Sequence, residues 1–211
     1  EKKATANKFC NNPIDFISHS NLSTHLKNPN SFINELIEEL KNIKTRWEPQ
    51  GKTTKKGFQS FENLFEKPNG KLKTLNSIII DELDSYYLKF KNENCSYIKK
   101  WPSKKRLHGW FVKLKQQGYQ ASHIHAGGWL SGVIYLKVVP HLGKNEGAIE
   151  LGLNGELYLD LNSPKVIFQP KVGDIIMFPS SLHHKTIPFS VDEDRISIAF
   201  DLIPNEIKLV N

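Results

Sequence analysis

The hydrophobic period changes once along the chain, at about residue 108, and this change limits the folds open to it. Before that point, apolar residues recur every three or four positions over 29–47 and 71–91, which predicts two amphipathic helices. Asn28 followed by Pro29 is typical of a helix start. After that point, apolar and polar residues alternate in short runs, which predicts strands.

Turn-forming pairs separate these runs, among them Gly127-Gly128, Asn154-Gly155 and Ser163-Pro164. The expected strands are 110–114, 130–139, 147–151, 156–161, 165–168, 174–178 and 195–203. Two helices followed by many short strands predict an α+β, mainly β fold. We expect a jelly roll or a similar double-sheet barrel, with the helices packed outside it.

We predict a single domain over 1–211, because a chain of this length buries a substantial core and no repeat or Pro-rich or Ser-rich linker divides it. Within it, 1–108 is expected to be a mainly helical support region and 109–204 the jelly-roll core. The first residue is Glu1 and not Met, as expected of a segment of a longer protein, and no secretory signal is visible.

Composition excludes several classes of protein. The aliphatic runs are far shorter than the roughly 20 residues that span a bilayer, so no membrane partner is expected. Cys10 and Cys95 cannot form a disulfide framework or a Cys-x-x-Cys metal knuckle, which fits a reducing, cytoplasmic setting. Basic residues outnumber acidic ones by 29 to 22 and cluster around Trp101. Single-stranded nucleic acid is a conceivable partner, but the excess is nearly all lysine and a solvated loop explains it better.

Histidines carry the clearest chemical signal. In His123-Ile124-His125, residues i and i+2 of an extended segment point the same way, so both imidazoles can reach one metal ion. An apolar strand and a Pro-led turn lead to His184, and a small double-sheet barrel would return it beside the first pair. Imidazole suits Fe, Zn, Cu and Ni, and three imidazoles on one side of such an ion leave positions open for substrate or oxygen.

Arg195 and Ser197 begin the last expected strand and share one face, while Ile196 and Ile198 take the other. An arginine with a hydroxyl at the inner end of a metal-bearing barrel forms a fork that binds carboxylates. The plain alternative for Arg195 is a surface ion pair with an acidic neighbour in 192–194.

Three segments carry a resemblance to a known family. Residues 123–136 read HIHAGGWLSGVIYL, residues 173–184 read GDIIMFPSSLHH, and residues 195–200 read RISIAF. In this order and spacing they resemble the 2-oxoglutarate- and Fe(II)-dependent oxygenases of the double-stranded β-helix superfamily, in a branch similar in pattern to the prolyl hydroxylases. The resemblance is specific over 109–203 and extends loosely upstream.

The resemblance implies a cupin-like double-stranded β-helix with N-terminal helices packed on one sheet. It also implies a dioxygenase that couples decarboxylation of 2-oxoglutarate to oxidation of a substrate, foremost its hydroxylation. Fe(II), 2-oxoglutarate and O2 would be required, with ascorbate as a reductant. By position, His123 and His184 match iron ligands. Arg195 and Ser197 match the residues that bind the distal carboxylate of 2-oxoglutarate, and Tyr135 matches a tyrosine that reaches the same carboxylate.

The third metal ligand departs from the usual pattern. His125 occupies the position where most of the superfamily has Asp or Glu, and we predict it to be the ligand. The alternative is a carboxylate from elsewhere, for which Glu150 on an expected strand is the candidate. Beyond the metal ligands, the scheme requires no catalytic acid or base.

Two other functions stay open from the residues alone. A cupin-like metal enzyme without 2-oxoglutarate would not need Arg195 and Ser197. A non-enzymatic jelly-roll binding module would use a structural metal with a closed coordination sphere. The substrate, a small molecule or a protein side chain, and the oligomeric state are not specified. Trp129 could line the substrate entrance or pack at the rim, and Thr53 and Gln59 could hold substrate or form turns.

Overall fold

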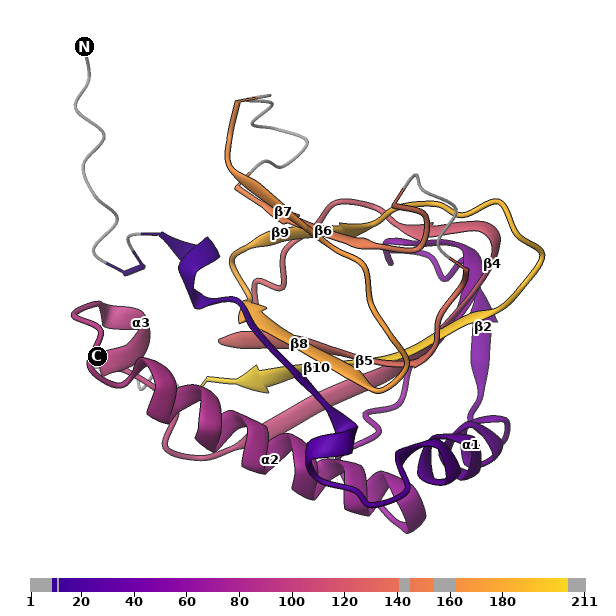
Figure 1. The fold of residues 1–211 in the computed structure, drawn as a ribbon, viewed down its shortest axis with the longest axis horizontal. Coiled ribbons are helices and arrows are strands. Elements are labelled where there is room, and N and C mark those ends of the chain that lie inside the picture. Colours follow the sequence, from indigo (N-terminus) through magenta and orange to yellow (C-terminus); the bar gives the residue numbers. More distant parts are fainter. Residues whose placement is uncertain (1–8, 11, 141–144, 154–161, 205–211) are drawn as a thin grey trace.

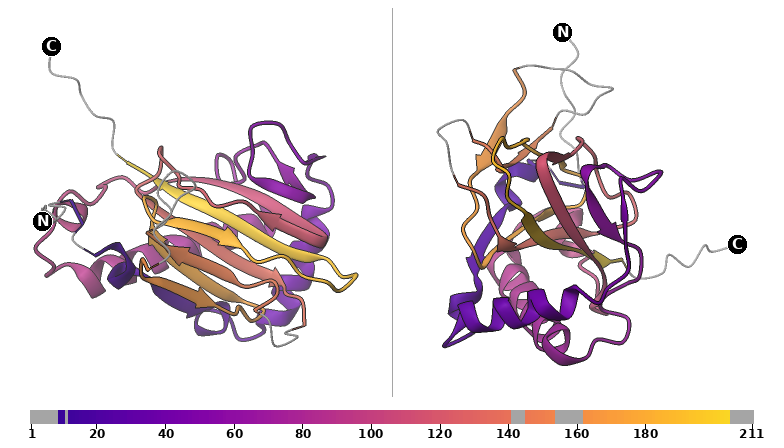
Figure 2. Two further views of the ribbon diagram at one scale, coloured as in Figure 1. Left: turned by 90° about the horizontal axis from the view of Figure 1, so that it is seen from above. Right: turned by 90° about the vertical axis from the view of Figure 1, so that its right-hand side faces the viewer.

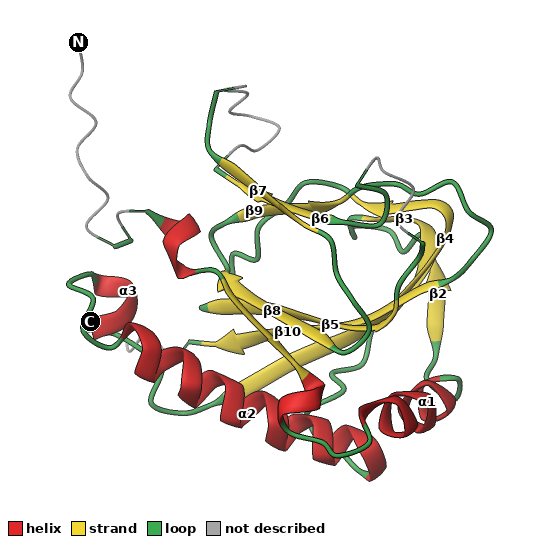
Figure 3. Cartoon of the chain, viewed as in Figure 1, coloured by secondary structure: helices red, strands yellow, loops and turns green. Residues whose placement is uncertain are grey.

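Two antiparallel sheets face each other, and the helices cover the outer side of the larger sheet (Figures 1 and 3). The computed structural model describes residues 9–10, 12–140, 145–153 and 162–204. The helices are α1 (Pro29–Leu40), α2 (Gly70–Phe90) and α3 (Ser96–Lys99), with 3-10 turns η1 (Pro13–Phe16) and η2 (Leu22–Thr24). None of the described helices is long and apolar enough to cross a membrane.

The larger sheet has seven strands in the order β1-β8-β5-β10-β4-β3-β2. They are β1 (Ser18–Asn21), β2 (Thr45–Trp47), β3 (Thr54–Ser60), β4 (Arg106–Gln120), β5 (Leu130–Lys137), β8 (Asp174–Pro179) and β10 (Arg195–Ile203). The smaller sheet, in the order β7-β6-β9, contains β6 (Ile149–Gly152), β7 (Lys165–Phe168) and β9 (His183–Thr186). Figure 2 shows the two sheets from above and from the side. The predicted double-stranded β-helix is confirmed.

The side chains of strand β10 alternate between the two faces of the larger sheet. Ile196, Ile198 and Phe200 pack into the core that α1 and α2 cover. Because successive side chains alternate across a sheet, Arg195, Ser197 and their i+2 neighbours point toward the smaller sheet. The helices therefore stabilise the sheet from outside, and the polar residues of β10 are left for the barrel interior.

The first predicted helix was wrong beyond Leu40. The structure ends α1 there, and Thr45–Trp47 form β2, which pairs with Phe58–Ser60 of β3. Asn42 and β-branched Ile43 favour leaving the helix, and the backbone groups of β2 find partners in the sheet. The Trp47 side chain is 49% exposed and does not belong to the helical stripe.

The support region is less helical than predicted, because it supplies three strands of the larger sheet. Strands β1, β2 and β3 lack clear apolar alternation, and β3 contains Lys55-Lys56-Gly57. Pairing with β8 and β4 overrides this weak local signal. β9, whose residues were expected only as a site after a turn, is also a strand. The expected strand 156–161 lies outside the described residues.

Candidate metal centre

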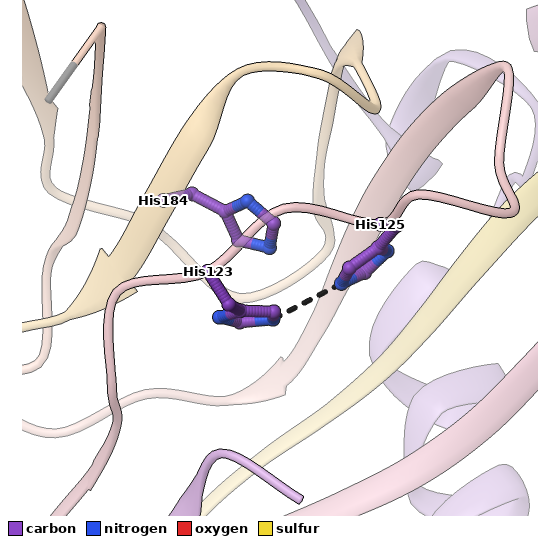
Figure 4. Close-up of side chains that lie close together, drawn as sticks. All are labelled: His123, His125 and His184. Carbon is purple, nitrogen blue, oxygen red and sulfur yellow. Dashed lines mark hydrogen bonds between the residues drawn. The ribbon is translucent and has the colours of Figure 1, made fainter. Parts of the chain in front are cut away.

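The loop between β4 and β5 brings His123 and His125 beside His184 of β9 (Figure 4). His123 and His184 exchange two backbone hydrogen bonds, N to O, of 3.1 and 3.0 Å. The backbone N–H of His125 donates to the carbonyl of Ser180 at 2.9 Å. The extended His-Ile-His segment is therefore held by the turn and strand that carry the third histidine.

The three imidazoles point toward one another, and each offers one ring nitrogen to a common point, these atoms lying within 4.8 Å of one another (Figure 4). Nε2 of His123 and Nε2 of His125 are 3.0 Å apart. In each ring the other nitrogen, Nδ1, lies against a hydrogen-bond acceptor. For His123 this is Ala121 O at 2.7 Å, and for His184 it is Leu182 O at 3.1 Å. For His125 it is the carboxylate oxygen Asp201 Oδ1 at 2.6 Å.

These acceptors assign the tautomer. Backbone carbonyls and an ionised carboxylate only accept, so each neutral imidazole carries its proton on Nδ1 and a lone pair on Nε2. Burial lowers the pKa of His123 to about 4, with a further lowering from the charge of His125. Burial also lowers the pKa of His184 well below its ordinary value. At neutral pH, His123 and His184 are therefore neutral rings suited to bind a cation.

The spacing fits a metal ion. Two nitrogens that each lie about 2.1 Å from a metal at a right angle are about 3.0 Å apart, which matches the Nε2 separation of His123 and His125. Two lone pairs at that distance repel unless a positive charge lies between them. The site therefore fits a divalent cation bound by three ligands on one side.

Glu150 lies in β6 and takes no part in this cluster. Its carboxylate is 3.1 Å from Lys185 Nζ and 3.7 Å from Lys165 Nζ, on the outer face of the smaller sheet. Leu151, the next residue, faces inward and is fully buried. The alternation of the strand thus points Glu150 away from the three histidines.

A cavity of about 370 Å³ opens beside His123 and His125. Its other lining residues come mainly from the hairpin β2–β3, strand β4 and the start of the β4–β5 loop; they are Gly51, Lys52, Thr53, Gln59, Ser60, Phe61, His108, Trp110, Gln120, Ile124, Gly127 and Asp201. The Trp110 ring lies 5.3 Å from the His125 ring, centroid to centroid. The open side of the histidine cluster thus faces a space of small-molecule size.

Deeper in the barrel, Arg195, Ser197 and Tyr135 lie on neighbouring strands. Ser197 is opposite Tyr135 in the β10–β5 register, and all three side chains are buried. The Arg195 guanidinium carbon is 4.9 Å from the Tyr135 ring centroid, and Arg195 Nε donates to Gly147 O at 2.9 Å. Among the described residues no carboxylate pairs with Arg195, so the expected alternative of an ion pair with 192–194 is wrong.

The Tyr135 hydroxyl is buried and makes no well-formed hydrogen bond in the described part of the chain, although the Arg195 guanidinium lies close enough to act on it. Burial raises the pKa of Tyr135 to about 12, against the lowering effect of the Arg195 charge. Burial also lowers the pKa of Arg195 from its ordinary value. A buried cation beside an unpaired buried hydroxyl fits the carboxylate of a ligand.

Sequence reasoning missed Asp201, Ser131 and Ser180. Asp201 continues the inward face of β10, six positions after Arg195, in an otherwise apolar strand. That i+2 alternation was the available signal. Ser131 lies inside the mainly apolar β5 and Ser180 directly follows β8, and neither belongs to a polar pattern.

Two tryptophans belong to the packing of the outer core. Trp129 stacks on Tyr97 at 5.9 Å and donates from Nε1 to Tyr97 O, which decides for packing and against the substrate entrance. Trp101 stacks on Tyr86 at 5.4 Å. Its indole therefore packs on the aromatic core beside α2.

Comparisons with known sequences find one family match, over the strands that carry the site. Residues 108–201 match the family model described as "Putative 2OG-Fe(II) oxygenase". No curated protein sequence matches the chain.

The fold is similar to those of several solved structures at low sequence identity. A Pseudomonas putida prolyl-4-hydroxylase superposes with a TM-score of 0.59 at 11% identity, covering 90% of this chain and 93% of that one. A Trichoplax adhaerens prolyl hydroxylase gives 0.58 at 12%, covering 89% and 83%. The carbocyclase SnoK from nogalamycin biosynthesis gives 0.61 at 13%, covering 97% and 87%. The comparisons thus show a double-stranded β-helix fold for the chain, and residues 108–201, which carry the site, match the family of 2-oxoglutarate- and Fe(II)-dependent oxygenases.

Proposed function

We propose that the chain is a hydroxylase in which His123, His125 and His184 hold the iron and Arg195, Ser197 and Tyr135 hold 2-oxoglutarate. One observation carries the proposal. Three imidazole lone pairs converge at the open end of the same barrel interior that buries an arginine to which no described carboxylate is paired. A cation site and an anion site in one interior match a dicarboxylate that binds iron with one end and the arginine with the other.

Bound together, iron and 2-oxoglutarate would supply the oxidising chemistry, in which decarboxylation of 2-oxoglutarate is coupled to oxidation of a substrate C–H bond by O2. The residues of the chain would position the bound groups and shield them from water. Its three imidazoles occupy one side of the ion and leave the cavity side open. Arg195 neutralises the distal carboxylate, to which the Tyr135 hydroxyl can donate. Ile149, Leu151 and Phe178, buried around Tyr135, exclude water from that contact.

The cavity beside the histidines is the proposed substrate site. Its volume of about 370 Å³ lies within the range of small-molecule sites and would also admit a protein side chain. Lys52 lines it, and Arg46, Lys55 and Lys56 lie in the same hairpin. This charge favours a substrate with an anionic group, and Phe61 and Trp110 offer it apolar contacts. We also propose a cytoplasmic location, supported by the free thiols of Cys10 and Cys95.

Anaerobic titration tests this function. Metal-free protein would receive Fe(II) and then 2-oxoglutarate, while absorbance is followed for the weak visible charge-transfer band of the iron chelate. We expect the band with the wild type and not with Arg195→Ala at the same concentrations. A band that does not depend on Arg195 would contradict the assignment of the anion site. Tight iron binding without any response to 2-oxoglutarate would favour a cupin-like enzyme.

Turnover provides the second measurement. Iron-loaded protein with O2 and ascorbate should form succinate slowly even without its substrate, because the cavity side of the site is open. His184→Ala is the background control. Equal succinate from both proteins would contradict the proposed metal site.

A further inference from the structure

A buried carboxylate lies directly behind one of the three histidines. Asp201 Oδ1 is 2.6 Å from Nδ1 of His125, and the Asp201 residue is only 7% exposed. Ser131 Oγ donates to the same Oδ1 at 2.6 Å, and Ser180 Oγ lies 2.8 Å from Ser131 Oγ. The carboxylate oxygen thus receives two hydrogen bonds, one from the imidazole and one from a braced hydroxyl.

The directions of these bonds follow from the chemistry of the groups. An ionised carboxylate only accepts, so His125 donates its Nδ1 proton and Ser131 donates its hydroxyl proton. Ser131 has one proton, already given to Asp201, so Ser180 donates to Ser131. The chain of hydrogen bonds fixes the ring of His125 with Nε2 directed at the other two imidazoles.

The other two histidines have no such partner. Nδ1 of His123 and Nδ1 of His184 both donate to backbone carbonyls, which carry no net charge. Within the part of the chain that the structure describes, His125 alone of the three is bonded to a formal negative charge. His125 is also the residue that stands where most related oxygenases have a carboxylate ligand. The charge absent from the ligand position is therefore present one hydrogen bond further out.

We propose that Asp201 is a positioning residue that supplies the metal centre with negative charge through the His125 ring. The inference rests on the proposed role of the three histidines as metal ligands. A carboxylate that accepts the Nδ1 proton makes Nε2 a better electron-pair donor and holds the ring in the binding orientation. The centre then keeps three neutral ligands and still offsets part of the charge of the ion.

Two other roles for Asp201 make different predictions. As a direct ligand it would have to turn from His125, yet the nitrogen cluster that converges in the structure contains only the three histidines. As a contact for a cationic substrate, which its place in the cavity wall would allow, it would not affect metal binding in the absence of substrate.

Asp201→Asn separates charge from geometry. Both hydrogen bonds to Asp201 go to Oδ1, so an amide with its oxygen in that place accepts both and removes only the charge. The matched control is Glu82→Gln. Glu82 of helix α2 is also 7% exposed, and its carboxylate also lies 2.6 Å from an imidazole, that of His25, which follows η2 outside the barrel.

The experiment titrates metal-free protein with Co(II), with no 2-oxoglutarate or substrate present, and follows the visible ligand-field bands. Asp201→Asn should weaken Co(II) binding about 10- to 100-fold and shift these bands, and Asp201→Glu should recover part of the affinity. Ser131→Ala should cost a smaller factor, about two- to tenfold, because it removes one hydrogen bond to the carboxylate. Glu82→Gln should bind Co(II) as the wild type does.

The outcomes separate the proposal from the function on which it rests. Wild-type affinity and an unchanged spectrum in Asp201→Asn would overturn the role of Asp201 and leave the three-histidine site intact. Failure of the wild type to bind Co(II) would overturn the metal centre itself. Equal losses in Asp201→Asn and Glu82→Gln would mean that any buried imidazole–carboxylate pair affects binding through stability, and the proposal would fall. Thermal unfolding of each variant without metal measures that effect directly.

Discussion

The polar groups at the two ends of the barrel interior differ in whether the protein itself supplies their hydrogen-bond partners. At the histidine end, all three Nδ1 atoms and the Asp201 carboxylate have hydrogen-bond partners, and what remains is a set of converging lone pairs. At the arginine end, among the described residues, the Tyr135 hydroxyl makes no well-formed hydrogen bond and Arg195 has no carboxylate partner. The first end is already arranged for a cation. The second keeps a free-energy cost that an anionic ligand removes on binding.

The variant with the largest expected effect, His184→Ala, disrupts the histidine end alone. His184→Ala should weaken Fe(II) binding by more than the roughly 100-fold that losing a ligand's hydrogen-bond partner can cost, because it removes a ligand. His183→Ala is the matched control, since the neighbouring residue of β9 points to the other face of the strand. Anaerobic Fe(II) titration measures both. Equal losses from the two variants would show that the strand and not the imidazole matters.

The variant with the next largest effect, Arg195→Ala, disrupts the arginine end alone. Arg195→Ala should weaken 2-oxoglutarate binding by about two to three decades and leave Fe(II) binding unchanged, because removing one partner of a buried charged pair costs roughly 3–5 kcal/mol. Arg195→Lys keeps the charge and loses the planar fork, so an intermediate affinity is expected. Isothermal titration of iron-loaded protein measures these affinities. Lys137→Ala, which removes a surface cation from β5, should have no effect.

Tyr135→Phe sharpens the comparison, because it should act in opposite directions on two measurements. Removing a buried hydroxyl that makes no well-formed hydrogen bond among the described residues should raise the free energy of unfolding of the ligand-free protein by about 1–3 kcal/mol. The same change should weaken 2-oxoglutarate binding about ten- to hundredfold, through the lost hydrogen bond to a charged carboxylate. Denaturant unfolding and ligand titration measure the two effects. A variant less stable than the wild type would indicate that the hydroxyl has a partner within the protein.

The smallest expected effect on Fe(II) affinity is that of Glu150→Gln, which tests the alternative third ligand. Glu150→Gln should leave Fe(II) affinity nearly unchanged, because its carboxylate contacts Lys165 and Lys185 on the outer face of the smaller sheet. His125→Ala should abolish tight binding. Equilibrium dialysis with Fe(II) under anaerobic conditions separates the two variants. The reverse order of affinities would make Glu150 the ligand.

The parts of the fold that the sequence predicts are those in which burial and local pattern agree. β5, β8 and β10 contain long apolar or alternating runs, so their positions are evident. β1 and β3 carry mainly polar residues, and only their partners β8 and β4 make them strands. The apolar stripe that suggested a helix as far as Trp47 counted residues of an exposed strand.

The candidate site likewise has parts that local sequence patterns predict and parts that they do not. The spacing of His123 and His125 and the alternation of Arg195 with Ser197 are local patterns, and the structure brings each pair to one side. Asp201 meets His125 across 76 positions of sequence, and nothing in either segment indicates that meeting. Local periodicity predicts which face a residue takes, whereas the partner it finds depends on how the strands pair.

The mutual backbone hydrogen bonds between His123 and His184 bear on the rate of metal capture. Two of the three candidate ligands are carried by segments that hold each other in place, so the polypeptide has little to rearrange when an ion arrives. Association should then be limited by how fast the ion sheds its own water, and ions that exchange water slowly, such as Ni(II), should bind more slowly than Fe(II) or Co(II) at equal concentration.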